Sequence, residues 1–249
     1  METCIVSYEA FCRGQAEKAA ALLKAGQVVA FPTETVYGLG ALALDEKAVG
    51  KIFAAKGRPQ DNPLIVHIYK TEQARQLSAD WTVAAETLTK AFWPGPLTVI
   101  VKASEKIPKA VTAGLDTVGL RMPQGEVAKT LIELAGPIAA PSANTSGRPS
   151  PVTATHVYED MQGRIPMIID GGPCRVGVES TVVDATGDVP VILRPGHITR
   201  EQIASLLGKC EVAGGVLNPV TGEKAASPGM LHRHYAPKGQ TVLVEMGPQ

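Results

Sequence analysis

Short apolar runs alternate along most of the chain with longer segments in which apolar residues recur at helical spacing. The short runs are rich in β-branched residues and are bounded by Pro, Gly or polar residues, which is typical of buried strands. We predict strands over residues 27–31, 64–69, 97–101, 117–122, 138–140, 167–170, 180–184 and 189–193. We predict helices over residues 13–25, 45–56, 71–78, 83–92, 125–134 and 199–208. This alternation indicates an α/β fold, and strands that follow one another directly indicate a mixed sheet.

Residues with strong capping preferences mark the ends of several predicted helices. Asp45 is a suitable N-cap for the second helix, and Gly57 is a suitable stop for it. Gly26 can end the first helix in the same way. Thr199 and Gln202 have the spacing of a capping box, in which each side chain bonds the backbone N–H of the other residue.

The pattern changes near residue 209. From there to residue 237 Gly, Pro and basic residues dominate and periodicity is lost, which predicts a linker. Residues 241–245 then predict one strand, and a lone strand cannot form a domain. That strand either docks on the main sheet or begins a further unit. We therefore divide the chain into a main α/β domain over 1–208, a linker or lid over 209–240, and the start of a truncated C-terminal domain over 241–249.

Composition narrows the classes of protein that fit. Apolar residues make up 45% and charged residues 19% of the chain, which supports a sizeable core and excludes wholesale disorder. The formal net charge is zero, whereas proteins that grip a nucleic-acid backbone usually carry a basic excess. The four cysteines form no C-x-x-C pair, which favours unpaired thiols in a reducing compartment. No signal peptide and no apolar run of the ~20 residues needed to span a membrane is visible, so we predict a cytoplasmic protein.

Two glycine patterns are weak candidates for nucleotide binding. Residues 38–43 formally match the dinucleotide fingerprint G-x-G-x-x-A, but no βαβ unit with a ribose-binding acid follows. Gly50 and Lys51 fail the P-loop pattern because the next residue is Ile52. Any use of ATP would therefore run through another kind of phosphate cradle.

Two loops carry polar groups suited to a nucleotide. Lys56 and Arg58 lie in a proline-stiffened loop that also contains Asn62, and two cations with an amide can grip a polyphosphate. The alternative is that these cations only complement the dipole of the preceding helix. Residues 141–151 form a loop of hydroxyls, an amide, a glycine and an arginine, which suits a phosphate or ribose, although an ordinary Ser/Gly turn has the same composition.

Other polar residues lie on predicted strands or in the linker. Thr117 and Arg121 share one face of a strand, and an arginine among apolar neighbours needs a buried anionic partner from the protein or from a ligand. His67 alternates with apolar residues, so it also fits an interior histidine. The basic-aromatic residues 232–235 suggest a lid, or else a solvated linker.

Taken together, these segments resemble, in order, the YrdC/Sua5 family of threonylcarbamoyl-adenylate synthases. The matching segments are residues 32–40, 56–59, 62–67, 94–96, 119–123, 141–144, 179–184 and 193–196. Residues 227–230 and 234–237 are similar to the linker of the longer, Sua5-type branch. Each motif is modest evidence alone, but the ordered set is specific.

The resemblance implies an activity and a fold. L-threonine, bicarbonate and ATP would give threonylcarbamoyl-AMP and pyrophosphate, and the product would serve threonylcarbamoyladenosine (t6A37) synthesis in tRNA. The fold would be a twisted, mixed parallel/antiparallel sheet with flanking helices around a deep basic cavity. Mg²⁺ would accompany ATP without dedicated protein ligands. Partners would be downstream threonylcarbamoyl-transfer proteins and, weakly, RNA, but no membrane. The Sua5 branch carries a C-terminal α/β domain, which we expect this chain to lack.

The resemblance also assigns site residues by position. Threonine would be held by Thr35, His67, Arg121, Ala140 and Ser180. ATP would be held by Arg58, Asn62, Thr117, Ser142, Asn144, Ser150, Arg194 and Tyr235. Lys56 and Arg58 would be catalytic because they neutralise charge on the polyphosphate. Arg121 would pair with the threonine carboxylate, and Tyr235 would close over the nucleotide.

Three other functions remain open at this stage. A double-stranded RNA-binding module would use a basic cavity, but zero net charge and few aromatics disfavour it. A carbamoyl-adenylate enzyme of hydrogenase maturation has a related fold, but such proteins carry a zinc-finger region, and no zinc-type cysteine spacing is present. A regulatory nucleotide sensor would bind ATP without threonine-dependent turnover.

Overall fold

The computed structural model of the protein describes residues 2–214. The predicted strand over 241–245, Tyr235 and most of the predicted linker lie outside the described residues. Within the described part, helices flank a sheet of mixed strand direction, so the predicted fold class is confirmed.

Twelve strands of the described chain join one sheet. Their order is β1-β9-β2-β3-β8-β4-β7-β6-β10-β11-β12, with β5 paired to β6. The strands are β1 (Cys4–Ser7), β2 (Val29–Phe31), β3 (Gly38–Leu42), β4 (Ile65–His67), β5 (Ser78–Asp80), β6 (Leu97–Ala103), β7 (Thr117–Arg121), β8 (Ile138–Ala139), β9 (Met167–Asp170), β10 (Thr181–Asp184), β11 (Val191–Arg194) and β12 (Glu211–Val212). β4 pairs in parallel with β7, whereas β6 and β7 are antiparallel.

Five of the six predicted helices begin and end near the predicted residues, and the predicted helix over 13–25 starts later, at Ala16, because the chain kinks at Arg13 and Gly14. They are α1 (Tyr8–Ala10), the π-helical turn η1 (Phe11–Gln15), α2 (Ala16–Lys24), α3 (Glu46–Lys56), α4 (Thr71–Leu77), α5 (Val83–Phe92), α6 (Lys109–Thr112), α7 (Glu126–Ala135), α8 (Ala154–Met161) and α9 (Arg200–Leu207). The Asp45 side chain caps α3, which ends at Gly57 in the left-handed conformation. Thr199 and Gln202 form the predicted capping box of α9.

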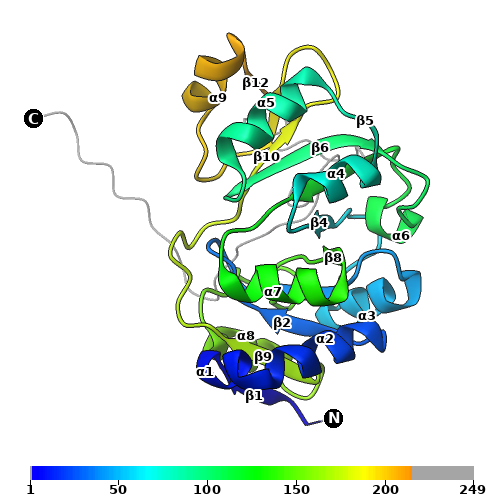
Figure 1. Ribbon diagram of the computed structural model, residues 1–249, viewed down its shortest axis with the longest axis vertical. Coiled ribbons are helices and arrows are strands. Elements are labelled where there is room, and N and C mark those ends of the chain that lie inside the picture. Colours follow the sequence, from blue (N-terminus) through cyan, green and yellow to red (C-terminus); the bar gives the residue numbers. More distant parts are fainter. Residues whose placement is uncertain (1, 215–249) are drawn as a thin grey trace, which may run out of the picture.

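Helices cover both faces of the sheet, and the alternation of β2 shows how. Val29 and Phe31 pack into an apolar cluster with α2 and α7, whereas Ala30 between them packs into the larger cluster that contains α3. Figure 1 shows the sheet running from β1 and α1 at the lower end to β12 and α9 at the upper end. Burial of one large apolar side chain contributes about 1.5–3 kcal/mol. Each cluster therefore stabilises the packing of helices on its own face of the sheet.

Strand β3 was missed by the sequence analysis because its glycines weaken a strand pattern. A side chain at Gly40 would lie 2.6 Å from the Phe31 ring and 2.7 Å from the Ile138 side chain, so only glycine fits there. The glycines of the weak dinucleotide match therefore allow close packing between neighbouring strands. The weak interpretation of residues 38–43 as a nucleotide fingerprint finds no support in this position.

Further elements were missed, among them β1, α6, α8 and β12. Strand β12 pairs with β11 although its residues fall in the segment predicted as a linker. Strand β1 lies at the edge of the sheet, where it pairs only with β9 among the described strands, and an edge strand needs little apolar alternation. Helix α8 lies between the predicted loop over 141–151 and the predicted strand over 167–170, where no element was predicted. The Thr153 hydroxyl accepts from the His156 N–H and caps the start of this helix.

Candidate active site

A pocket with about 580 Å³ of empty volume lies where the β2–β3 loop meets the ends of β4, β7, β8 and β10. Predicted site residues that line it are Thr35, Arg58, His67, Arg121, Ala140, Ser142, Ser180 and Arg194. All five predicted threonine-site residues are in this set. The predicted ATP-site residues are more dispersed.

Strand register brings two of the predicted residues together. His67 on β4 lies opposite Arg121 on β7, and both side chains are buried. Burial, followed by the neighbouring Arg121 cation, lowers the pKa of His67 to about 3, so the imidazole is neutral at pH 7. The Nδ1 atom of His67 is buried and has no hydrogen-bond partner among residues 2–214.

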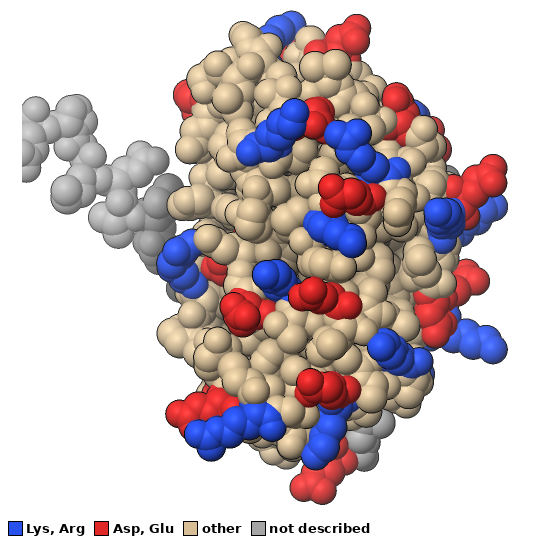
Figure 2. All heavy atoms as spheres, in the orientation of Figure 1, with Lys and Arg blue, Asp and Glu red and all other residues tan. Residues whose placement is uncertain are grey.

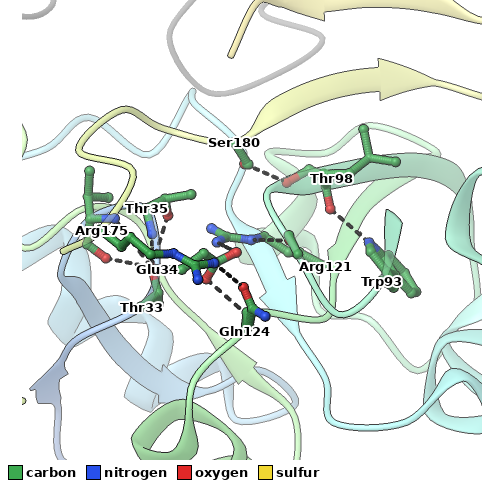
Figure 3. A network of polar contacts seen from close by, with 12 residues as sticks. Thr33, Glu34, Thr35, Trp93, Thr98, Arg121, Gln124, Arg175 and Ser180 are labelled. Carbon is green, nitrogen blue, oxygen red and sulfur yellow. Dashed lines mark hydrogen bonds and ion pairs between the residues drawn. The ribbon is translucent and has the colours of Figure 1, made fainter. Parts of the chain in front are cut away.

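The buried partner that Arg121 requires is Glu34. An Arg121 Nη2 atom lies 2.7 Å from Glu34 Oε1, and the side chains are only 5% and 4% exposed. The Nε–H of Arg121 donates to the Gly95 carbonyl at 3.3 Å. Figure 3 shows Arg121 and Glu34 reaching toward one another, with Gln124 beside the pair. Sequence reasoning identified the need for an anion but did not find Glu34, which lies on the β2–β3 loop.

A hydroxyl network orders the β2–β3 loop. The Thr33 hydroxyl donates to the Val36 carbonyl at 2.7 Å, and its oxygen lies 2.9 Å from the Thr35 hydroxyl. A hydroxyl has one proton, so the Thr35 hydroxyl must donate to Thr33. The Thr35 oxygen then keeps lone pairs that can accept a further hydrogen bond, and the residue lines the pocket.

The opposite wall carries a second arginine–glutamate pair. Arg194 on β11 forms an ion pair with Glu179, and its Nη2 donates to the Ser180 carbonyl at 3.0 Å. The Ser180 hydroxyl lies 2.8 Å from that of Thr98 on β6. Ser150 donates to Glu179 at 2.8 Å, which ties the 141–151 loop to this wall.

Lys56 does not line the pocket. Its Nζ is buried and donates to the Ser142 and Asn144 carbonyls, both at 2.5 Å. Burial, followed by the nearby Arg58 cation, lowers the pKa of Lys56 to about 7. A neutral amine still has two N–H donors, so the two contacts can persist in either protonation state. The structure therefore places the predicted catalytic Lys56 as a support for the 141–151 loop.

Arg58 lines the pocket, whereas the predicted ATP residues Asn62 and Asn144 do not. Arg58 Nη2 donates to the Asn62 and Pro63 carbonyls at 3.3 and 3.1 Å. The amide of Asn62 is buried, and neither its Nδ2 nor its Oδ1 has a partner in the described chain. Asn144 Nδ2 donates to two carbonyls of its own loop.

Thr117 lies in a neighbouring, smaller pocket. That pocket has about 260 Å³ of empty volume and is lined mainly by apolar groups together with Thr98 and Thr117. Ile65 borders both pockets, so the two adjoin. The smaller pocket is therefore mainly apolar, whereas three arginines line the pocket that contains His67 and Ser180.

On the face shown in Figure 2, the molecular surface has no patch in which arginines gather as they do in the pocket. Lysines and arginines are interspersed there with aspartates and glutamates. No group of three or more His, Cys, Asp or Glu side chains able to hold a metal is present in residues 2–214. None of the helices in the same range is long and apolar enough to cross a membrane.

A mixed α/β sheet with three arginines lining one pocket is the kind of arrangement that suits small anionic ligands. Comparison with known proteins makes this specific. The Sua5_yciO_yrdC family model, described as "Telomere recombination", matches residues 21–196. The chain belongs to this Sua5/YciO/YrdC family.

Relatives and solved structures agree. The chain is 54% identical over 232 residues to the threonylcarbamoyl-AMP synthase of Pyrococcus abyssi, covering 93% of this chain and 68% of that one. It is 52% identical over 237 residues to the Bacillus subtilis enzyme of the same name, covering 94% and 68%. The crystal structure of P. abyssi Sua5 complexed with L-threonine superposes with a TM-score of 0.91 at 51% identity, covering 96% and 70% of the chains.

One expectation from the sequence is wrong. A second model, described as "Threonylcarbamoyl-AMP synthase, C-terminal domain", matches residues 198–249, so the C-terminal domain is represented in this chain. The match includes α9, whose residues fall within the predicted main domain over 1–208. The boundaries at 208 and 240 themselves remain predictions.

Proposed function

We infer that the chain is an L-threonylcarbamoyladenylate synthase, a nucleotidyltransferase that forms threonylcarbamoyl-AMP and pyrophosphate from L-threonine, bicarbonate and ATP. The product serves threonylcarbamoyladenosine (t6A37) synthesis in tRNA. The observation that carries this conclusion is the set of threonine-site residues converging on one pocket, in a chain that superposes on a relative solved with L-threonine.

Threonine would bind at the strand-built end of the pocket. Its carboxylate would pair with the guanidinium of Arg121, and its ammonium would donate to the Thr35 hydroxyl. The neutral His67 adds no positive charge against that ammonium. Ala140 and Ser180 would border the side chain.

ATP would bind at the loop-built end. The adenine ring would enter the small apolar pocket beside Thr117. The phosphates would extend toward Arg58, Ser142 and Arg194, which line the larger pocket. The buried, unpartnered amide of Asn62 would gain hydrogen bonds from the nucleotide, which removes the cost of leaving it unsatisfied.

The chemistry would follow from this placement. Threonine's amine condenses with bicarbonate to a carbamate, with loss of water, and a carbamate oxygen attacks the α-phosphorus while the bond to pyrophosphate breaks. Holding two anions together and neutralising their repulsion is the main requirement. Mg²⁺ would arrive with ATP and be held chiefly by its phosphates. The cytoplasmic location, bicarbonate site, downstream transfer proteins and weak RNA contact remain predictions.

The test is pyrophosphate release from ATP with bicarbonate, with and without L-threonine. The inference predicts strong stimulation by L-threonine and none by D-threonine. ATP binding without stimulation would instead favour a nucleotide sensor. Salt-sensitive retention on double-stranded RNA without turnover would favour an RNA-binding module.

A further inference from the structure

We propose that Glu34 is a positioning residue that fixes the guanidinium of Arg121 and thereby gives the pocket its preference for a carboxylate. This inference rests on the proposed function, because it takes threonine as the ligand of Arg121. No contact between Glu34 and the ligand is needed.

The contacts divide the guanidinium into two edges. An arginine has five N–H donors in a planar fork. The edge formed by Nε and Nη2 of Arg121 faces the protein, since Nε donates to the Gly95 carbonyl and Nη2 lies 2.7 Å from Glu34 Oε1. The contact with Glu34 is an ion pair without hydrogen-bond geometry. Nη1 has no hydrogen-bond partner in the described chain, and Arg121 lines the larger pocket. The edge that includes Nη1 is therefore the one left for a ligand carboxylate.

Glu34 acts from the other side of Arg121. Glu34 does not line the pocket that contains His67 and Ser180. It lines a separate, more open pocket with about 760 Å³ of empty volume, together with Gln124 and Arg175. A carboxylate in that place cannot compete for the ligand face of Arg121 by direct contact. It can only set where the guanidinium lies.

Glu34 is itself held rigidly. Its Oε2 accepts from the Gln124 N–H at 3.1 Å, and its backbone carbonyl accepts from the Val176 N–H at 2.8 Å. Arg175 in turn donates to the Gln124 side chain at 2.5 Å. Figure 3 shows Arg175, Glu34 and Gln124 gathered on one side of Arg121. The β2–β3 loop, the start of α7 and the 171–177 loop thus fix one carboxylate.

Two substitutions at position 34 separate the role of side-chain length from the role of side-chain charge. Glu34→Asp keeps the charge but withdraws the carboxylate by one methylene, so it cannot hold Arg121 in place. Glu34→Gln keeps the length and can present its carbonyl oxygen to Arg121, although its NH₂ group then faces the Gln124 N–H. If position decides, Gln preserves the function of the residue better than Asp; if charge decides, the order is reversed.

The experiment measures dissociation constants for L-threonine, L-threonine amide and ATP by titration calorimetry on the full chain. The amide keeps the amine and hydroxyl but lacks the carboxylate charge, so the ratio of the two constants measures carboxylate preference. We expect Glu34→Ala and Glu34→Asp to reduce this preference by on the order of 10²-fold, with ATP affinity retained. Glu34→Gln should lose distinctly less. The exposed Glu126, which borders the same second pocket, supplies the matched control Glu126→Gln, which should behave as wild type.

The outcomes separate the proposal from the proposed function. A wild-type chain that does not prefer threonine to its amide overturns both. A wild-type preference that survives in Glu34→Ala and Glu34→Asp overturns the role of Glu34 alone. The same holds if the variants lose threonine and ATP affinity equally, or if Asp preserves the preference better than Gln. Should Glu34→Ala fail to fold, the comparison of Asp with Gln decides.

Discussion

The two ends of the pocket, for which we propose threonine and the nucleotide as ligands, are built differently. At the threonine end, His67 and Arg121 stand on paired strands whose register places them side by side, and the cation has a buried carboxylate partner. At the nucleotide end, Arg58 and Ser142 stand on loops, and the Asn62 amide is buried without a partner in the described chain. Strands fix a side chain through backbone hydrogen bonds, whereas a loop needs side-chain supports such as Lys56.

The two ion pairs repeat this difference. The side chains of Arg121 and Glu34 are 5% and 4% exposed, whereas those of Arg194 and Glu179 are 12% and 17% exposed. Breaking a buried pair leaves an uncompensated charge and is strongly destabilising, and the effect weakens as water gains access. The threonine end should therefore tolerate substitution less well than the nucleotide end.

The largest expected effect is at Arg121. Arg121→Ala should reduce threonine-dependent pyrophosphate release by on the order of 10²-fold or more, because the carboxylate loses its charged partner. ATP binding should persist, which calorimetry can measure. Arg75→Ala, which removes an exposed cation paired with Glu86, is the control and should keep wild-type turnover. Equal loss of ATP binding in the Arg121 variant would mean that the two ends are not independent.

Lys56 tests the loop-built end. Lys56→Met leaves two buried carbonyls without a donor, which costs about 1–3 kcal/mol each, and should loosen the 141–151 loop. We expect ATP affinity to fall by about 10-fold, while threonine affinity measured by calorimetry stays within error. Lys51→Met on the exposed face of the same helix is the matched control. Unchanged ATP affinity would refute the support role.

The buried His67 should make the free energy of unfolding depend on pH. Its pKa is about 3 in the folded chain, against about 6.5 in the unfolded chain. The unfolded state therefore binds more protons between these values, so the free energy of unfolding falls as pH falls from about 6.5 to about 3, by at most ~1.4 kcal/mol per pH unit. Urea unfolding across this range should show a shallower slope in His67→Gln.

The exposed His156 provides the comparison for that measurement. His156→Gln should leave the slope of stability against pH unchanged. If both histidine variants behave alike, the burial of His67 does not control the titration.

The smallest effect is expected at Thr98, which supports Ser180 from behind. Thr98→Val removes one buried hydrogen bond, worth about 1 kcal/mol, and should raise the KM for threonine by about 5-fold. Thr98→Ser keeps the hydroxyl and should restore the wild-type KM. A Val variant with unchanged kinetics would show that Ser180 needs no support.

Much of the fold follows from local sequence. Capping at Asp45 and Gly57 and the β-branched runs predicted most helices and strands, because these signals depend on neighbouring residues only. Strand β3 was missed because the need for Gly40 arises from Phe31 and Ile138 on the adjacent strands. This contact depends on which strands are neighbours in the sheet, and a single sequence does not specify that.

The candidate site divides in the same way. The sequence determined that Arg121 is an arginine among apolar residues and so requires an anion, and motif order indicated which residues form the pocket. Only the tertiary structure decided that Glu34 supplies this anion and that Lys56 supports a loop from behind. Such pairings join residues far apart in the chain, and they depend on strand order and register, which the alternation of polar and apolar residues does not specify.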